Sequence, residues 1–221
     1  MAYLLHIETA TKVCSVALSL DGQLVALKES DDSEYIHGEV ITLYIQDVMQ
    51  QAKISINELA AVSVTSGPGS YTGLRIGVST AKGLCYALNI PLIAVDALLS
   101  IASIARQKYT STTICAMIDA RRMEVFSTIF DASGELVKPT SADVLDETSY
   151  SEFEPFIAVG DGSSKMMDVW KNRNIQFDLT TKHSSIGQIT PAYTKFLKND
   201  FEDVAYFEPY YLKDFVSTQK K

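Results

Sequence analysis

Residues 66–77 have the sequence SGPGSYTGLRIG, and this stretch joins two predicted elements of an α/β fold. The apolar run at 60–65 predicts a strand before it, and the spacing of apolar residues at 72–88 predicts a helix after it. The glycines and the proline predict a tight turn, with Ser70 or Thr72 as the helix cap. Free N–H groups at such a turn can bind an anion, but the Lys-Ser or Lys-Thr pair of a P-loop is absent from this stretch. A capped strand-to-helix turn is therefore the favoured interpretation.

The segments around this stretch form a pattern that occurs twice. Before residue 107, apolar periodicity and the turn signal Asp21-Gly22 predict strands at 3–8, 13–20, 23–29, 60–65 and 92–95 and helices at 34–52, 72–88 and 96–107. After it, they predict strands at 112–118, 123–130, 136–145 and 156–159 and helices from 162 to 170 and at 185–198. Two successive units of strands followed by helices predict a duplicated α/β fold. We expect domains at 1–106 and 107–221.

Composition places the chain among globular proteins. Of its 221 residues, 47% are hydrophobic and 21% are charged, which excludes disorder and allows a sizeable core. The longest apolar runs are too short for a membrane-spanning helix. Cys14, Cys85 and Cys115 each lie in an apolar segment, so we expect buried, reduced thiols and a cytoplasmic protein.

The charge balance limits the partners that this chain can bind alone. The net charge is −8 and the pI is about 4.9, whereas a protein that grips nucleic acid usually carries a basic patch. Adjacent basic residues occur at Arg121-Arg122 and Lys220-Lys221. If RNA is involved, we expect another subunit to supply the positive surface.

Two helices near the amino end have unusual apolar patterns. In the helix at 72–88, small residues recur every four positions although each interior glycine costs about 1 kcal/mol relative to alanine, which favours close approach of another backbone. In the helix at 34–52, apolar residues cover roughly 240° of the circumference, against about 100° for an ordinary surface helix. Either the two helices cover each other completely, or they present a joint apolar surface to another chain. We favour the second alternative.

Two polar segments are candidates for nucleotide binding. Glu8, Thr9 and Thr11 follow the first strand, where actin-like ATPases hold metal and phosphate with a carboxylate and hydroxyls, although a polar β-turn is the favoured interpretation. The segment Gly160-Asp161-Gly162 lies between a strand and a helix and can face a nucleotide. The three histidines, His6, His37 and His183, are far apart in the sequence, so we predict no metal site and no catalytic residue.

The chain resembles the TsaB (YeaZ) family over nearly its whole length. The resemblance rests on Leu5–Ala10 with Ser15–Leu18, on 66–77, on Asp119–Phe126, on Gly160–Gly162 and on Pro209–Leu212. It implies a two-domain actin-like/Hsp70-like/sugar-kinase (ASKHA) fold and membership of the bacterial machinery that makes N6-threonylcarbamoyladenosine beside the anticodon of tRNA. In that machinery the catalytic subunit, TsaD, carries a His-x-x-x-His motif, which TsaB proteins and this chain lack.

The resemblance further implies a non-catalytic subunit that forms a heterodimer with TsaD, to which TsaE binds. It implies indirect contact with tRNA, a homodimer when alone, no cofactor of its own, and ATP or ADP with Mg²⁺ only at the level of the complex. Glu8 and Ala10 depart from the Asp and Ser common in the family, which weakens the alternative of a stand-alone actin-fold ATPase or kinase. The expected partner interface comprises His37, Ile41, Ile45, Met49, Gly73, Leu74, Gly77, Val78, Ala81 and Cys85.

Overall fold

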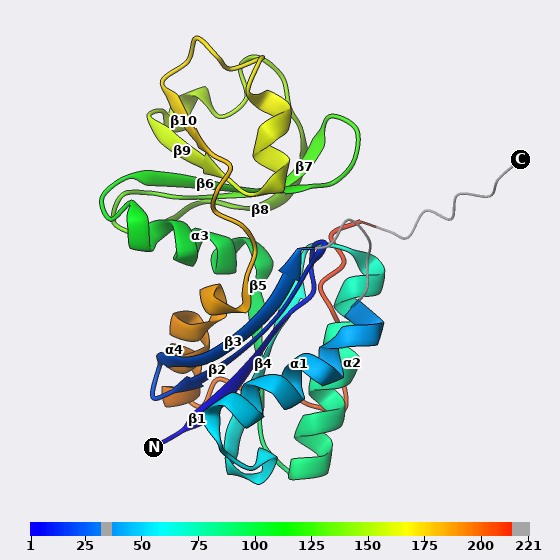
Figure 1. The fold of residues 1–221 in the computed structure, drawn as a ribbon. Coiled ribbons are helices and arrows are strands. Elements are labelled where there is room, and N and C mark those ends of the chain that lie inside the picture. Colours follow the sequence, from blue (N-terminus) through cyan, green and yellow to red (C-terminus); the bar gives the residue numbers. More distant parts are fainter. Residues whose placement is uncertain (32–36, 214–221) are drawn as a thin grey trace, which may run out of the picture.

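The computed structural model describes residues 1–31 and 37–213, and these residues form two five-stranded sheets joined by helices (Figure 1). The strands of the first sheet are β1 (Tyr3–Glu8), β2 (Val13–Leu20), β3 (Gln23–Asp31), β4 (Leu59–Gly67) and β5 (Leu92–Asp96). Those of the second are β6 (Thr113–Asp119), β7 (Glu124–Phe130), β8 (Leu136–Val144), β9 (Phe156–Val159) and β10 (Ile175–Asp178). Ile36 and the Lys220-Lys221 pair lie outside the described residues.

The two sheets share one topology. The strand order is β3-β2-β1-β4-β5 in the first sheet and, read in the same direction, β8-β7-β6-β9-β10 in the second. In each sheet the first three strands are antiparallel, and the fourth and fifth run parallel to the first. The predicted duplicated α/β fold is therefore confirmed.

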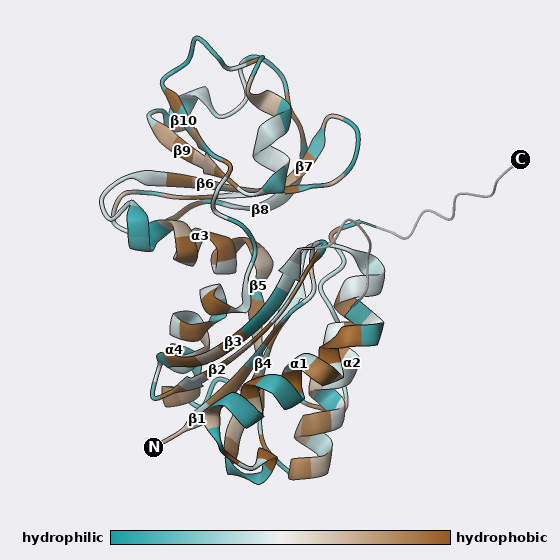
Figure 2. Cartoon of the chain, in the orientation of Figure 1, coloured by the Kyte–Doolittle hydropathy of each residue, from teal (hydrophilic) through white to brown (hydrophobic). Residues whose placement is uncertain are grey.

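Helices cover both faces of the first sheet. Helices α1 (His37–Ala52) and α2 (Tyr71–Leu88) pack on one face over a core built around Leu5, Val62 and Val64. Helix α4 (Ile189–Leu197) packs on the opposite face. Figure 2 shows hydrophobic residues along the central strands, whereas the edge strand β3 is hydrophobic in its first part and hydrophilic from Lys28 onward. Burial on both faces explains why the central strands are almost continuously apolar.

Helix α3 (Ala97–Lys108) packs against the second sheet and lies between the two halves in Figure 1. Its predicted cap is confirmed, because the Asp96 carboxylate accepts hydrogen bonds from the amides of Leu98 and Leu99 at 2.8 and 2.9 Å. On the other face of the second sheet the buried Trp170 ring packs against Phe156 and Tyr150. Each sheet thus has a core of its own.

The structure differs from the expected elements at three places. The helix expected up to residue 170 is a short 3-10 helix, Asp161–Met166, followed by turns, and the helix expected at 185–198 is α4 preceded by a 3-10 turn. Strand β10 was not predicted, because a four-residue edge strand after a polar run has too few residues to show a period.

The carboxyl-terminal part of the chain returns to the first sheet. Helix α4 packs on β5, and the Glu202 amide donates to the Leu92 carbonyl at 2.9 Å. The expected assignment of all of 107–221 to a second domain therefore does not hold for residues 185–207, which pack on the first sheet.

Within the described residues, Cys14, Cys85 and Cys115 are buried and form no disulfide, as predicted. Burial raises the pKa of the Cys85 thiol to about 11, so this thiol stays protonated and inert at neutral pH. Among the described helices, none combines the length and apolar character that crossing a membrane would require.

Candidate functional site

The inner face of α2 lies directly on the end of β1. A Cβ atom added at Gly73 would lie 2.1 Å from the Thr9 carbonyl oxygen, and one added at Gly77 would lie 2.3 Å from Thr9 Oγ1. Both distances are far shorter than van der Waals contact, so glycine is required for α2 to approach this turn. The small residues therefore serve packing within the chain.

The residues expected to form the partner interface do not lie at the surface of the described chain. All ten residues are buried within the chain, on the sides of α1 and α2 that face the first sheet. His37 illustrates the point, because its Nε2 donates to the Thr11 carbonyl at 2.7 Å and burial lowers its pKa. The residues that were expected at the interface and are buried instead are His37, Ile41, Ile45, Met49, Gly73, Leu74, Gly77, Val78, Ala81 and Cys85.

The opposite sides of these two helices form a different surface, which we call the outer face. It consists of Leu43 on α1, which is 55% exposed, and Ser79, Gly83 and Tyr86 on α2, of which Tyr86 is 85% exposed. A Cβ atom added at Gly83 would meet nothing within 4 Å. This glycine therefore has no packing role inside the described chain, although it weakens the helix.

The turn after β1 is closed by its own contacts. Glu8 is buried, and its carboxylate accepts hydrogen bonds from the Ala10 amide at 2.8 Å and from Thr65 Oγ1 at 2.5 Å. Thr9 is covered by α2. Of the first candidate nucleotide segment, only Thr11 lines a cavity.

The second candidate segment is also divided between core and cavity. Gly160 and Asp161 line the cavity, whereas a Cβ atom at Gly162 would lie 2.8 Å from the Ile118 backbone. The expectation that Glu8, Thr9 and Gly162 face a ligand is therefore wrong, because these residues do not line the cavity and are surrounded by protein atoms. Thr11, Gly160 and Asp161 are brought together.

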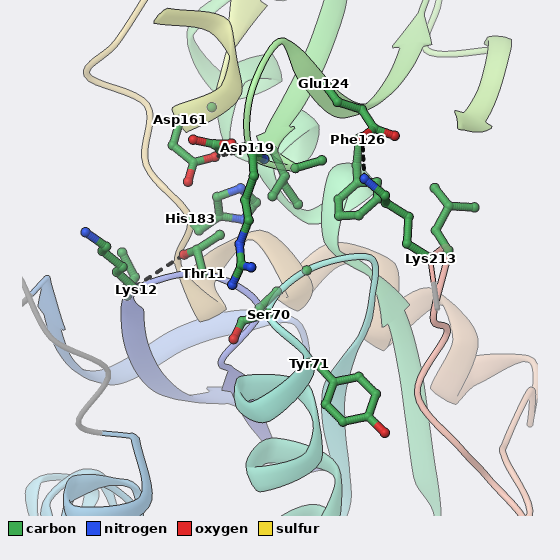
Figure 3. A pocket seen from close by; sticks show the side chains of 18 of the residues that line it. Thr11, Lys12, Ser70, Tyr71, Asp119, Glu124, Phe126, Asp161, His183 and Lys213 are labelled. Carbon is green, nitrogen blue, oxygen red and sulfur yellow. Dashed lines mark hydrogen bonds and ion pairs between the residues drawn. The ribbon is translucent and has the colours of Figure 1, made fainter. Parts of the chain in front are cut away.

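That cavity is a cleft of about 1200 Å³ between the two halves of the molecule (Figure 3). The first half contributes Thr11, Lys12 and the first turn of α2 at 70–72. The second half contributes the turn at 119–122 between β6 and β7, with Gly160 and Asp161. Two crossing segments, at 179–183 and 210–213, complete the walls. The volume suffices for a ligand of mononucleotide size.

The lining of the cleft carries more cationic than anionic side chains, although the whole chain is acidic. Five cationic residues and three carboxylates line the cleft, and two of the carboxylates are already paired. Asp119 forms an ion pair with Lys165 at 2.6 Å, and Glu124 pairs with Lys213. The cationic lining residues are Lys12, Arg121, Arg122, Lys182 and Lys213. Such a balance favours an anionic ligand.

His183 lies in this cleft with its polar atoms unsatisfied. The residue is 4% exposed, and neither ring nitrogen hydrogen bonds within the described part of the chain. Burial lowers the pKa of the imidazole, and the nearby Glu8 charge opposes that shift. Figure 3 shows the ring between Thr11 and Asp161. Sequence reasoning missed this placement, because His183 stands alone in a polar segment with no motif around it.

The residues after β1 do not fit a Mg²⁺–nucleotide of the kind that actin-like ATPases hold. Both Glu8 oxygens accept hydrogen bonds from protein groups, and α2 covers Thr9. Within residues 1–31 and 37–213, three or more His, Cys, Asp or Glu side chains nowhere gather as a metal would need.

Comparisons with known proteins agree with this fold and identify the family. A family model described as "TsaD: tRNA N6-adenosine threonylcarbamoyltransferase" matches residues 32–218. The tRNA threonylcarbamoyladenosine biosynthesis protein TsaB of Escherichia coli is 39% identical over 123 residues, which are 56% of this chain and 52% of that protein. The chain belongs to the TsaB (YeaZ) family. It spans about half the length of the curated TsaB relatives that it matches first.

A solved member of the TsaB family has the same fold. YeaZ from Pseudomonas aeruginosa superimposes with a TM-score of 0.82 at 24% identity, covering 96% of this chain and 100% of that one. The tRNA N6-adenosine threonylcarbamoyltransferase of Geobacillus kaustophilus is 51% identical over 59 residues, which are 27% of this chain and 17% of that enzyme. The duplicated actin-like fold expected from the resemblance is thus confirmed.

Proposed function

We propose that this chain is the non-catalytic partner of a TsaD-type transferase in the formation of N6-threonylcarbamoyladenosine in tRNA. The observation that carries the proposal is the outer face of α1 and α2 in a TsaB-family protein. There an unpacked glycine and an exposed tyrosine lie at the surface of one helix.

The outer face has the properties of a docking surface. Gly83 costs about 1 kcal/mol of helix stability relative to alanine and gains no contact inside the chain. A glycine at that place allows a second helix to approach closely. Tyr86 beside it is of a residue type enriched at interface hot spots, and Leu43 adds apolar area. These features support docking of another protein on this side.

The placement of the three histidines supports an accessory role. His6 hydrogen bonds to Ser63 and Ser19 at 2.7 and 2.8 Å inside the first sheet, and His37 binds the turn after β1. His183 lies in the cleft, and neither of its ring nitrogens hydrogen bonds within the described residues. The histidines therefore occupy three separate environments instead of forming one metal-binding pair.

The other expected associations belong to the same proposal. In the absence of the transferase, a second copy of the chain uses the outer face and forms a homodimer. TsaE joins the heterodimer, and tRNA is contacted mainly through the partner, in keeping with a net charge of −8. ATP or ADP with Mg²⁺ acts at the level of the complex, in the cytoplasm.

Co-purification with a TsaD-type transferase tests the proposal. Gly83→Arg places a long charged side chain on the outer face, where no described atom of the chain is displaced, and should abolish association while leaving the monomer folded. Thr194→Arg, at an exposed position of α4 on the opposite side of the sheet, is the matched control and should bind normally. Undiminished binding of the Gly83→Arg variant would contradict the docking surface.

A tRNA modification assay tests the activity directly. The transferase should form threonylcarbamoyladenosine faster with this chain than without it, and the Gly83→Arg variant should not replace the wild type. A stand-alone ATPase or kinase instead predicts Mg²⁺-dependent turnover by the isolated chain that Glu8→Gln reduces. Turnover of that kind would overturn the accessory role.

A further inference from the structure

The cleft contains a buried group that the fold leaves without a partner. A buried polar atom without a hydrogen bond carries a desolvation cost of about 1–3 kcal/mol, so folded proteins rarely leave one. In His183 both ring nitrogens are in this state. By contrast, the equally buried His6 has a hydroxyl partner for each nitrogen. A ligand in the cleft would satisfy His183.

The donors around His183 select an anion. Neither Lys12, Arg121 nor Arg122 forms an ion pair within the described residues, and all three line the cleft with His183. The first turn of α2, at 70–72, reaches the same cleft with the backbone N–H groups and positive dipole end of a long helix. These groups are donors, and their charge is positive.

The Arg121-Arg122 turn holds these side chains in an unfavourable backbone conformation. The φ angles are 71° and 51°, in the left-handed region that favours glycine or asparagine. The strain shows that glycine would suit the turn better than arginine. A function for the arginine side chains would explain their presence.

We propose that the interdomain cleft binds the phosphate group of a small ligand directly, without a divalent cation, through His183, the Arg121-Arg122 turn and the amino end of α2. The turn after β1 offers no carboxylate to a cation, because both Glu8 oxygens accept hydrogen bonds from protein groups and α2 covers Thr9. The inference does not depend on the transferase partner, since all of these donors belong to this chain.

Imidazole ¹⁵N NMR on the full chain tests the site. Pyrophosphate and AMP are titrated separately, each in the presence of EDTA, and the His183 resonances should shift in a saturable manner. His6 is the internal control, because both of its ring nitrogens have hydroxyl partners inside the first sheet, and its resonances should stay in place. Tighter binding of AMP would identify a nucleotide as the source of the phosphate, and equal affinities would identify phosphate alone.

Variants separate binding from folding. His183→Gln and the double variant Arg121→Gly/Arg122→Gly should each weaken binding by at least about tenfold, the value of one charge-assisted hydrogen bond. Glycine relieves the positive φ angles, so the double variant should unfold at a temperature no lower than the wild type. Lys171→Ala, an exposed cation outside the cleft, should bind normally.

Three results would overturn the proposal. The first is the absence of saturable binding of either probe up to about 10 mM, the range of the weakest specific affinities. The second is binding that leaves the His183 resonances in place. The third is binding that appears only when Mg²⁺ replaces EDTA.

Discussion

Helix α2 carries glycine on both of its sides, and the two sides differ in what the glycine does. On the inner side Gly73 and Gly77 have no room for a Cβ atom, because the turn at Thr9 fills that space. On the outer side Gly83 faces open space. The comparison shows that a small residue can mark close packing within a chain or room reserved for another molecule. Only the position of the sheet tells the two apart.

The same contrast separates two histidines. His6 and His183 are both buried, yet His6 has a partner for each nitrogen and His183 has none among the described residues. One histidine is part of the core, and the other lies at the wall of a cleft. In both comparisons, what the fold leaves unsatisfied indicates where other molecules bind.

The largest effect is expected on the inner side of α2. Gly73→Leu would force a side chain into the Thr9 carbonyl, so α2 would have to move away from the sheet. We expect a loss of about 3 kcal/mol or more in the free energy of unfolding, measured by chemical denaturation. An unchanged denaturation midpoint would show that the two faces of α2 do not differ in this way.

Lowering the pH should destabilise the folded chain, because its buried histidines stay neutral while the unfolded chain takes up protons. Burial lowers the pKa of His6 from 6.5 to about 3, so the folded state keeps it neutral while the unfolded state takes up a proton below pH 6.5. The free energy of unfolding should therefore fall by about 1.4 kcal/mol per pH unit, or about 2–3 kcal/mol between pH 6.5 and 4.5. In His6→Gln the slope should be smaller by about one proton over this range. If the free energy of unfolding fell equally steeply with pH in both proteins, groups other than His6 would be responsible for the pH dependence.

Truncating the exposed tyrosine of the outer face should weaken partner binding. Tyr86→Ala is expected to cost about 2 kcal/mol of affinity for a TsaD-type transferase, roughly 30-fold in Kd, as for an interface hot spot. Leu197 is 64% exposed and lies on α4, on the opposite face of the first sheet, so Leu197→Ala is the control. Isothermal titration calorimetry measures both. Equal affinities for the two variants would remove Tyr86 from the interface.

The smallest effect is expected at Gly83 itself. Gly83→Ala adds one methyl group in open space and should raise the free energy of unfolding of the monomer by about 0.5–1 kcal/mol through helix propensity. Thermal unfolding at low protein concentration measures it. Gly83→Ala should therefore raise the free energy of unfolding, whereas Gly73→Leu should lower it. Destabilisation by Gly83→Ala would contradict the difference between the two sides of α2.

Much of the fold could be predicted from local sequence. The Asp21-Gly22 turn has φ angles of 48° and 78°, as a hairpin of this type requires, and Asp96 caps α3 where expected. The strands before residue 160 follow their apolar runs closely. Predictions of this kind succeed because neighbours along the chain decide them.

The candidate sites were harder to predict because distant contacts decide them. The spacing of Gly73 and Gly77 indicates a close approach, but it cannot say that Thr9, far away in the sequence, is the group approached. His183 gave no signal at all, since its environment is built from both halves of the chain. For the same reason the sequence does not predict that residues 185–207 return to the first sheet.

That return has a consequence for biosynthesis. The face of the first sheet around Leu4, Ala61 and Ile93 is covered by α4 and by Phe201, which are translated long after the strands. While the ribosome is still making the second half, this face has no cover of its own. The nascent chain must therefore keep an apolar sheet face soluble until α4 and Phe201 emerge, and a fragment ending at residue 106 would expose the same surface permanently.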